Sequence, residues 1–354
     1  MFKLGMKAPA VPANVALYEN GETRFSHECE LDIKGWTSLN LDKKSLGVTF
    51  KGRYGGTLKG CDIFGNGITE FHSLAIRAGQ DYTFSVFRNE LMQELCLEGS
   101  DSLYTQASKY CILYVNGACY GIYCLKEDFS ELYYASHAGV TEDSVDGFRS
   151  PSEWYSEYNQ LVQHFGQTAD MTLPENYERV TSQINMDSLI DWFLFESWCA
   201  NSDTVGNMRV YRSTENGNKW EYAFYDLDWC LWSWDYNFKL LLADIGNGGP
   251  EMPWFLQNLL HNAEFRDRVL TRYAELIDTV FADEYVLAKI DEYEALLEPE
   301  LPRDRERWAL TMDSWHEWVD SMRDILEDGY AEYTIDTLCE CLNLTEEERA
   351  HYFG

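Results

Sequence analysis

One segment, residues 186–200, constrains the fold more than any other part of the chain because it is apolar on every face of a helix. Leu189, Trp192 and Phe195 stand among further large apolar side chains of this segment, so no face of the predicted helix is left for water. A helix of this kind is stable only where other elements surround it. The sequence therefore predicts a core built around residues 186–200, from which the following polar residues emerge.

Those polar residues begin a hairpin that also ends in polar residues. Two strand-like runs, residues 208–212 and 220–225, are separated by a connection with an Asn-Gly pair at 216–217, which is a strong hairpin signal. A hairpin brings its end close to its start. The polar patch at its start contains Asn201, Asp203 and Asn207, and we therefore expect Asp226 and Asp228 from its end to lie near Asp203 and Asn207.

The chemistry of this cluster suits a hard divalent cation. Magnesium is usually held by one or two carboxylates together with substrate phosphates. Manganese accepts the same oxygen ligands, so the sequence leaves the choice between Mg²⁺ and Mn²⁺ open. Asn and Asp are also ordinary turn and cap residues at strand ends. That explanation serves well for any one position and less well for the whole cluster, which we interpret as a metal–phosphate site.

The net charge of the chain limits the classes of molecule that it is expected to bind. Among 354 residues, 28 Lys and Arg stand against 60 Asp and Glu, which gives a net charge of −32. The resulting field repels nucleic acid and anionic membranes, whereas a basic or hydroxyl-rich protein would be attracted. A nucleotide is still compatible with the chain, because one metal ion and a few local cations override the global field. Solubility alone would also explain the acidity.

Cysteine usage and hydropathy bear on location. The ten cysteines show no CxxC pair and no zinc-like spacing with the seven histidines, so we interpret most of them as core residues of a reduced protein. An even number of cysteines would also allow disulfides if the chain is secreted. No apolar run reaches membrane-spanning length, and the N-terminus lacks the apolar region of a signal peptide. We expect a soluble protein. A secreted or cell-surface location would require a leader ahead of this N-terminus.

The order of elements predicts an α+β fold without regular βαβ units. Strand-like alternation occurs in the N-terminal part, at residues 28–34, 46–51, 72–77, 110–115 and 118–125. A helix is predicted over residues 84–97, with Ser85 as its N-cap. Residues 129–173 are polar and lack clear periodicity, which predicts an irregular insertion or substrate-facing loop. From residue 174 onward the pattern is mainly helical.

Five blocks of the chain resemble the CotH kinase family, atypical protein kinases named for a spore coat protein. They follow one another in the family's order: residues 31–45, which end in Lys-Lys-Ser; residues 76–90, with an Arg-x-Gly-x-Asp stretch; residues 115–128 (VNGACYGIYCLKED); residues 201–207; and Asp226-Leu227-Asp228. Each block alone is weak, but five in sequence are specific. The resemblance extends over most of residues 28–330.

The resemblance implies an atypical protein-kinase-like fold with a mainly β N-terminal lobe and a mainly helical C-terminal lobe. It divides the chain into an N-terminal segment over 1–28, a kinase-like domain over 29–330 and a C-terminal helical extension over 331–354. Within the kinase-like domain, the strand-rich lobe covers about 29–128 and the helical lobe covers about 174–330.

The resemblance also implies roles for the hairpin residues. Asp203 takes the catalytic position, and Asp226, further along the chain, takes a magnesium position. Asn207 would be the second metal ligand. Asp228 would assist the metal or orient its neighbour.

Phosphoryl transfer also needs a cation on the phosphates and an acidic residue to fix that cation. Lys44 is the first candidate for the cation and Arg77 the second, because both adjoin strands of the N-terminal half. Glu90 or Glu127 would hold it. A solvated loop lysine is almost as good an explanation of Lys44, and Glu127 could equally be a structural salt-bridge partner.

Two positions depart from the family pattern: Met208 stands where a second Asn is common, and Trp229-Cys230-Leu231 replaces a Gly-containing segment. The acidic residues are all present, so we expect an active, ATP- and Mg²⁺-dependent kinase that modifies Ser or Thr of a basic or Ser/Thr-rich protein. Two alternatives stay open, a non-catalytic spore-coat or cell-surface assembly module and a small-molecule kinase. For such a soluble protein we favour the cytoplasm or the spore coat.

Overall fold

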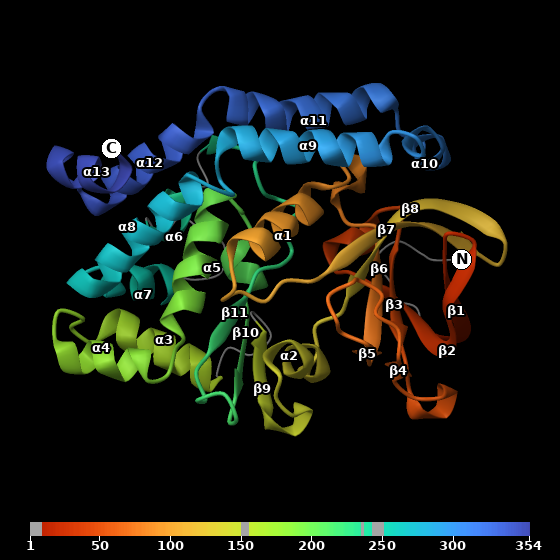
Figure 1. Ribbon diagram of the computed structural model, residues 1–354, viewed down its shortest axis with the longest axis horizontal. Coiled ribbons are helices and arrows are strands. Elements are labelled where there is room, and N and C mark those ends of the chain that lie inside the picture. The colour runs from red at the N-terminus through yellow and green to blue at the C-terminus, as the bar shows by residue number, and fades with distance from the viewer. Residues whose placement is uncertain (1–8, 150–155, 235–236, 243–250) are drawn as a thin grey trace. The chain divides into compact units, whose positions relative to one another are not determined.

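The computed structural model describes residues 9–149, 156–234, 237–242 and 251–354, and the chain divides into two compact units (Figure 1). Neither unit is continuous in sequence. The strand-rich unit consists of Met1–Phe87, Gln106–Val145 and Glu294–Trp318, and the helical unit consists of Arg88–Thr105, Asp146–Tyr293 and Val319–Gly354. An α+β architecture is confirmed, but each unit includes a segment from the other half of the chain.

A six-stranded antiparallel sheet forms the body of the strand-rich unit. Its spatial order is β1 (Val11–Glu19), β2 (Glu22–Lys34), β3 (Ser45–Thr49), β6 (Ser73–Arg77), β8 (Ala118–Glu127) and β7 (Ser108–Val115). The predicted strands are therefore confirmed. The sheet curls, since Lys109 on edge strand β7 lies 2.7 Å from Glu19 on the opposite edge strand β1.

The core of this unit lies on one face of the curled sheet. Val48 on β3 pairs with Leu74 on β6, and both side chains are fully buried. A small hairpin of β4 (Leu58–Lys59) and β5 (Glu70–Phe71) adds Leu58 and Phe71 to the same cluster. This small hairpin therefore contributes to the core.

A short helix from the C-terminal region, α10 (Leu301–Arg307), completes the strand-rich unit. Its Asp304 accepts hydrogen bonds from the Lys43 ammonium and from the backbone N–H of Ile122, both at 2.8 Å. Gly121 has φ +92°, and a Cβ at that position would lie 2.1 Å from the Asp304 carboxylate. Glycine is thus required where the chain meets this carboxylate.

The Lys43 ammonium has aromatic neighbours as well as Asp304. It lies 4.9 Å from the centre of the Tyr123 ring and 5.4 Å from that of Tyr82. The Lys43 and Asp304 side chains are only 1% and 0% exposed, so this ion pair is buried. We call Lys43, Asp304 and the Ile122 N–H the Asp304 clamp.

The helical unit surrounds α5 (Met186–Trp198). All residues of α5 except Asp187 are buried, which confirms the helix predicted to be enclosed on every face. A three-stranded sheet lies in the same unit, in the order β11 (Glu221–Ala223), β10 (Arg209–Ser213) and β9 (Val145–Arg149). The predicted hairpin is β10–β11, with Arg209 opposite Ala223.

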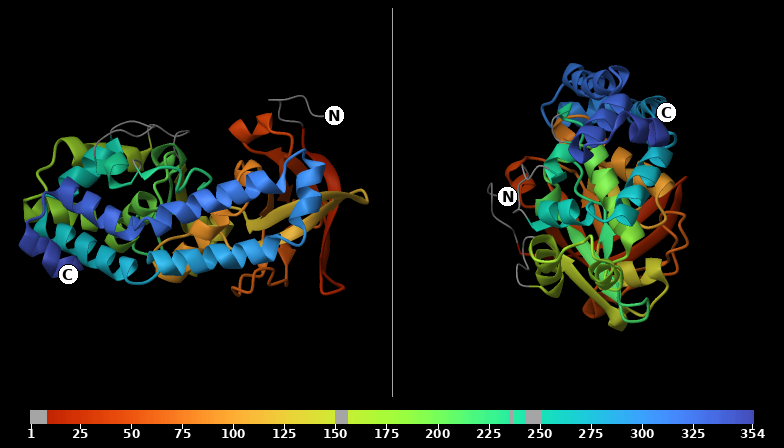
Figure 2. Two further views of the ribbon diagram at one scale, coloured as in Figure 1. Left: turned by 90° about the horizontal axis from the view of Figure 1, so that it is seen from above. Right: turned by 90° about the vertical axis from the view of Figure 1, so that its left-hand side faces the viewer.

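Further helices lie outside the segment 129–173. In chain order they are α1 (Arg88–Gly99), α4 (Pro174–Thr181), α6 (Phe238–Leu242), α7 (Glu251–Leu259), α8 (Ala263–Ile277), α9 (Asp283–Leu297), α11 (Met312–Glu327), α12 (Tyr330–Leu342) and α13 (Glu346–Phe353). Helices α9 and α11 lie side by side (Figure 2), and Arg323 bonds Asp291 across them at 2.5 Å. The division between the units falls within both helices.

Two local predictions are wrong. The helix predicted from residue 84 begins at Arg88, because Val86 has φ +76° and interrupts helical geometry, and Ser85 is therefore not its N-cap. The segment 129–173 is not an irregular loop. It contains α2 (Glu131–Ala138), β9 and α3 (Glu157–Gln167), and Ser130 and Ser156 cap the two helices. Residues 150–155 of this segment lie outside the described residues.

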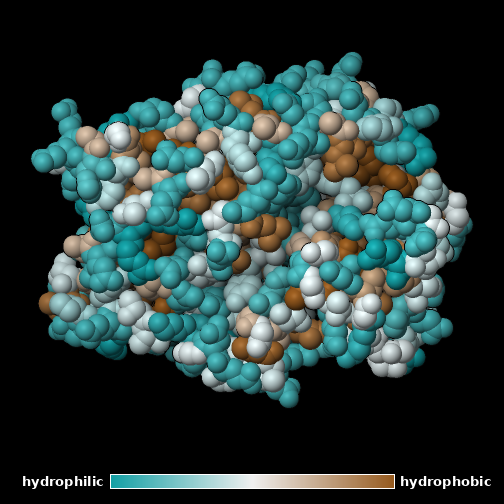
Figure 3. Space-filling model, viewed as in Figure 1, coloured by the Kyte–Doolittle hydropathy of each residue, from teal (hydrophilic) through white to brown (hydrophobic). Residues whose placement is uncertain are grey.

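The face shown in Figure 3 is mostly hydrophilic, with small separate hydrophobic areas. No helix in the described part of the chain combines the length and apolar character needed to cross a bilayer.

Candidate functional site

The candidate site begins where α5 ends. The helix stops at Cys199, and Ala200, with φ +52°, turns the chain out of the helical direction. The Cys199 carbonyl accepts a hydrogen bond from the Leu231 N–H at 2.8 Å, and the Sγ atoms of Cys199 and Cys230 lie 3.3 Å apart. These contacts hold the chain before the hairpin next to the chain after it.

A hydrogen-bonded network fixes the polar segment after α5. The Nδ2 of Asn201 and the Oγ1 of Thr204 donate to the same carboxyl oxygen of Glu196, at 2.9 and 2.8 Å. Glu196, Asn201 and Thr204 are all buried. In turn, the Oδ1 of Asn201 accepts from the backbone N–H of Asp203 at 3.2 Å. The backbone at Asp203 is therefore tied to a carboxyl group inside α5.

Asp203 and Asn207 lie side by side, as the sequence predicted. The Nδ2 of Asn207 donates to the Oδ2 of Asp203 at 2.8 Å across a single 3₁₀ turn, Thr204–Asn207. Burial raises the pKa of the Asp203 carboxyl, and the negative charge of Asp226 raises that pKa further. The hairpin therefore does bring Asp226 back to Asp203.

The two aspartates after the hairpin differ in exposure. Asp226 is exposed and has φ +62°, whereas Leu227 and Asp228 are buried. The N–H of Leu227 donates to the Oδ1 of Asn89 on α1 at 3.1 Å, which anchors the loop within the helical unit. This arrangement presents the Asp226 carboxylate toward solvent.

Glu196 is a buried residue of this network that the sequence analysis did not single out. Its carboxyl is 3% exposed, and burial together with the charges of Asp226 and Asp203 raises its pKa to about 8. At neutral pH this group is mainly protonated. A lone acidic residue within the apolar C-terminal turns of a helix was the available signal, because a buried carboxyl requires specific hydrogen-bond partners.

The cluster has the chemistry of a cation site. It combines carboxylate oxygens from Asp203 and Asp226 with the amide oxygen of Asn207, and the two carboxylates raise each other's energy. A divalent cation would relieve that repulsion. Within residues 9–149, 156–234, 237–242 and 251–354, no group of three or more His, Cys, Asp and Glu side chains is arranged to hold a metal on its own. Amide and phosphate oxygens would have to complete the coordination.

The two candidate cations lie in the strand-rich unit. The Lys44 ammonium donates to the backbone carbonyls of Leu39, at 2.8 Å, and Leu41. The Arg77 guanidinium lies 3.4 Å from the carboxylate of Asp81. Lys44 thus stabilises its own loop.

The two candidate acidic partners are both buried. Glu127 at the end of β8 accepts from the N–H of Ala107 at 2.9 Å, and its other oxygen lies 3.0 Å from the Nε2 of His137. Glu90 in α1 accepts from the Nδ2 of Asn89 at 3.0 Å. The contacts of Glu127 belong to its own unit and help to fix the end of β8.

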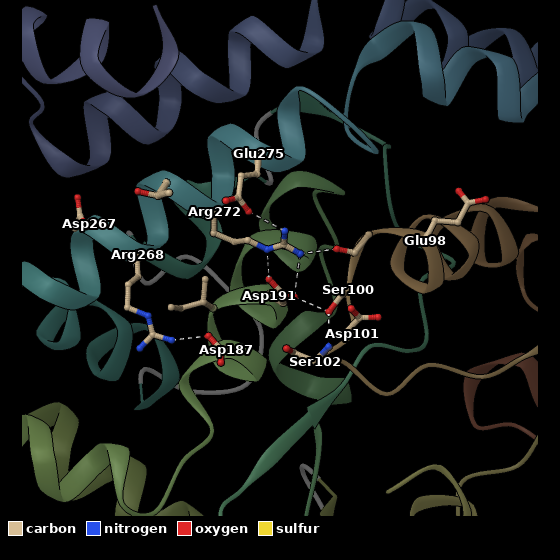
Figure 4. Close-up of a pocket in the computed structure, with 13 residues that line it drawn as sticks. Glu98, Ser100, Asp101, Ser102, Asp187, Asp191, Asp267, Arg268, Arg272 and Glu275 are labelled. Atoms are coloured by element: carbon tan, nitrogen blue, oxygen red, sulfur yellow. Dashed lines mark hydrogen bonds and ion pairs between the residues drawn. The ribbon is translucent and has the colours of Figure 1, made fainter.

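A separate cavity lies in the helical unit, between α5 and α8. It encloses about 490 Å³, and none of the predicted site residues lines it. Figure 4 shows Arg268 directed at Asp187 and Arg272 directed at Asp191, with distances of 2.6 and 2.8 Å. These two ion pairs join the helices, so we interpret the cavity as a feature of helix packing.

A curled antiparallel sheet, a mainly helical remainder and an Asp-rich hairpin define an α+β protein of the kinase-like class. A family model described as CotH kinase protein matches residues 31–331, which is most of the chain. The chain therefore belongs to the CotH kinase family. No curated protein matches it.

Proposed function

We propose that the protein is an ATP- and Mg²⁺-dependent protein kinase that phosphorylates Ser or Thr of another protein. One observation carries this proposal: Asp203, Asn207 and Asp226 come together at the two ends of the β10–β11 hairpin, through the 2.8 Å hydrogen bond of Asn207 and the effect of Asp226 on the pKa of Asp203. This is the residue set that phosphoryl transfer requires for orienting a hydroxyl and holding a metal.

Asp203 is proposed to orient the acceptor hydroxyl. As the hydroxyl oxygen attacks the γ-phosphorus, the hydroxyl proton passes to the Asp203 carboxylate, the bond from the γ-phosphorus to the bridging oxygen breaks, and ADP leaves. Asn207 and Asp226 would hold Mg²⁺, with help from Asp228. When bound, the ion supplies positive charge to the phosphate oxygens.

The phosphates also need a protein cation. Lys44 is the first candidate and Arg77 the second, with Glu90 or Glu127 as the acidic partner. Lys44 would have to release the carbonyls of Leu39 and Leu41 to reach a phosphate. The protein acceptor is proposed to be basic, since the net charge of −32 attracts such a chain.

Thermal unfolding with and without Mg-ATP tests the metal–nucleotide site. A ligand at one hundred times its Kd stabilises the folded state by about 2.7 kcal/mol, and we expect the wild type to show such a shift. Asp226→Asn should show none. Asp146→Asn is the matched control in the same unit, because the Asp146 carboxylate is exposed and bonds only Arg212 among the contacts described.

Transfer of labelled phosphate to a basic, Ser-rich protein tests the reaction itself. We expect activity in the wild type and its loss in Asp203→Ala. Full phosphotransfer by Asp203→Ala would overturn the role of Asp203. No thermal shift in the wild type would overturn the nucleotide site and favour a non-catalytic assembly module, while transfer only to small molecules would overturn the protein substrate.

A further inference from the structure

Glu196 belongs to α5, but its carboxyl accepts hydrogen bonds from the segment that follows the helix. The side chain is 3% exposed, and its Oε2 accepts from the Asn201 Nδ2 at 2.9 Å and from the Thr204 Oγ1 at 2.8 Å. A buried carboxyl is costly unless hydrogen bonds replace its water. In this case both replacement bonds come from residues five and eight positions further along the chain.

These bonds continue to the residues proposed to act in catalysis. Asn201 accepts from the N–H of Asp203 at 3.2 Å, and Thr204 is the first residue of the 3₁₀ turn that ends at Asn207. Asn207 then donates to the Asp203 carboxylate at 2.8 Å. The Glu196 carboxyl is thus the first link of a chain that ends on both Asp203 and Asn207.

We propose that Glu196 is a positioning residue, which holds residues 201–207 through Asn201 and Thr204 so that Asp203 and Asn207 are aligned for phosphoryl transfer. This inference rests on the function proposed above. An error of about 1 Å in the position of a catalytic group costs roughly 100-fold in rate, so loss of the link should lower kcat.

Two substitutions at this position separate the hydrogen bonds from the rest of the side chain. Glu196→Met keeps a similar length but offers no oxygen, so the Asn201 amide loses its acceptor and the Thr204 hydroxyl keeps only the Asn201 carbonyl, at 2.7 Å. Glu196→Gln keeps one carbonyl oxygen that can accept both bonds. We expect kcat to fall roughly 100-fold in Glu196→Met, with KM for Mg-ATP within about threefold of the wild type, and Glu196→Gln to restore kcat to within about threefold.

Thr204 provides a second, independent pair of variants. Thr204→Val removes the hydroxyl with little change of shape, and Thr204→Ser keeps the hydroxyl. The expected kcat is lowered in Thr204→Val and close to the wild type in Thr204→Ser. Equal kcat values for this pair would count against the network.

Asp191 provides the matched control on the same helix. It is 4% exposed, and its described bonds go to Arg272 and Ser100 (Figure 4). Asp191→Asn should lower the unfolding temperature without a change in kcat. A comparable loss of kcat in Asp191→Asn would show that any weakening of α5 impairs the enzyme, which overturns a specific role for Glu196.

Hydrogen exchange of the 201–207 amides gives a readout that does not depend on activity. We expect faster exchange in Glu196→Met than in the wild type or Glu196→Gln. Unchanged exchange, or a Glu196→Met enzyme with wild-type kcat, would overturn the inference. A wild type without phosphotransfer would overturn the proposed function instead, and the exchange pattern would then decide separately whether Glu196 holds this segment.

Discussion

Asp304 in the strand-rich unit and Glu196 in the helical unit are both buried carboxyl groups, but the protein stabilises them in opposite ways. Asp304 is paired with the ammonium of Lys43 at 2.8 Å and is 0% exposed. The bonds described for Glu196 come from a neutral amide and a neutral hydroxyl, and its other influential neighbours are Asp203 and Asp226. The charge of the Asp304 carboxylate is balanced by the Lys43 ammonium, whereas the Glu196 carboxyl retains its proton.

The difference separates a structural group from a functional one. A buried ion pair holds two elements in place and needs no ligand, even though in this pair only one oxygen of the Asp304 carboxylate accepts the described hydrogen bonds. Acidic groups gathered without a protein cation have a high electrostatic energy that a bound cation would lower. Among the contacts described, no protein cation pairs with Asp203 or Asp226. This is why we propose the metal and nucleotide site at the hairpin.

The largest effect is expected from breaking the compensated pair. Lys43→Met leaves the Asp304 carboxylate buried without its cation, which should lower the free energy of unfolding by about 3–5 kcal/mol. Urea denaturation measures the loss. The double variant Lys43→Met/Asp304→Asn removes the uncompensated charge and keeps an acceptor for the Ile122 N–H, so it should recover part of the stability. A loss below about 1 kcal/mol in Lys43→Met would contradict the comparison.

A smaller change in the free energy of unfolding is expected when the pH is raised from 5 to 7. Glu196 has a pKa of about 8 in the folded protein against 4.5 for the exposed group, so above pH 4.5 the unfolded chain releases a proton that the folded chain keeps. Stability therefore falls as pH rises toward 8. Between pH 5 and pH 7 this group contributes up to about 2.7 kcal/mol to the decrease. Asp203, whose pKa is also raised, acts in the same direction.

Urea denaturation at pH 5, 6 and 7 measures the contribution of Glu196 to the pH dependence of the free energy of unfolding. Glu196→Gln cannot ionise at this position, so its free energy of unfolding should fall less steeply with pH than that of the wild type. Lys43→Met serves as a variant in which the Glu196 contribution is retained. Identical pH slopes in the wild type and Glu196→Gln would mean that Glu196 is ionised in the folded protein.

The smallest effect is expected at an exposed ion pair. Arg212 bonds Asp146 at 2.8 Å, but the Asp146 side chain is 57% exposed. Solvent already screens this charge, so Asp146→Asn should cost less than about 1 kcal/mol in urea denaturation. A loss comparable with that of Lys43→Met would show that burial is not what distinguishes the pairs.

Local patterns in the sequence predicted the elements that depend on local chemistry. The apolar faces of α5 predicted its enclosure, and the Asn-Gly turn predicted the hairpin that returns Asp226 to Asp203. The helix start at residue 84 was misplaced because nothing in the sequence shows that Val86 has a positive φ.

Contacts between residues far apart in the sequence could not be predicted from local sequence patterns. Lys43 and Lys44 are neighbours of identical chemistry, yet only Lys43 lies against Asp304, 261 positions further along the chain. Periodicity carries no information about such a partner. Glu196 was visible as a polar exception in an apolar helix, but its donors could be identified only from the fold.

The Asp304 clamp also affects the order in which the chain can fold during synthesis. Ile122 and Asp304 are 182 positions apart, so the sheet is made long before the residue that completes it. At roughly 5–20 residues per second, the ribosome needs about 10–40 s to cover that distance. During this interval the Lys43 ammonium and the Ile122 N–H lack the carboxylate of Asp304 and have water as their partner. The N-terminal half therefore reaches its final structure only after Asp304 has been synthesised.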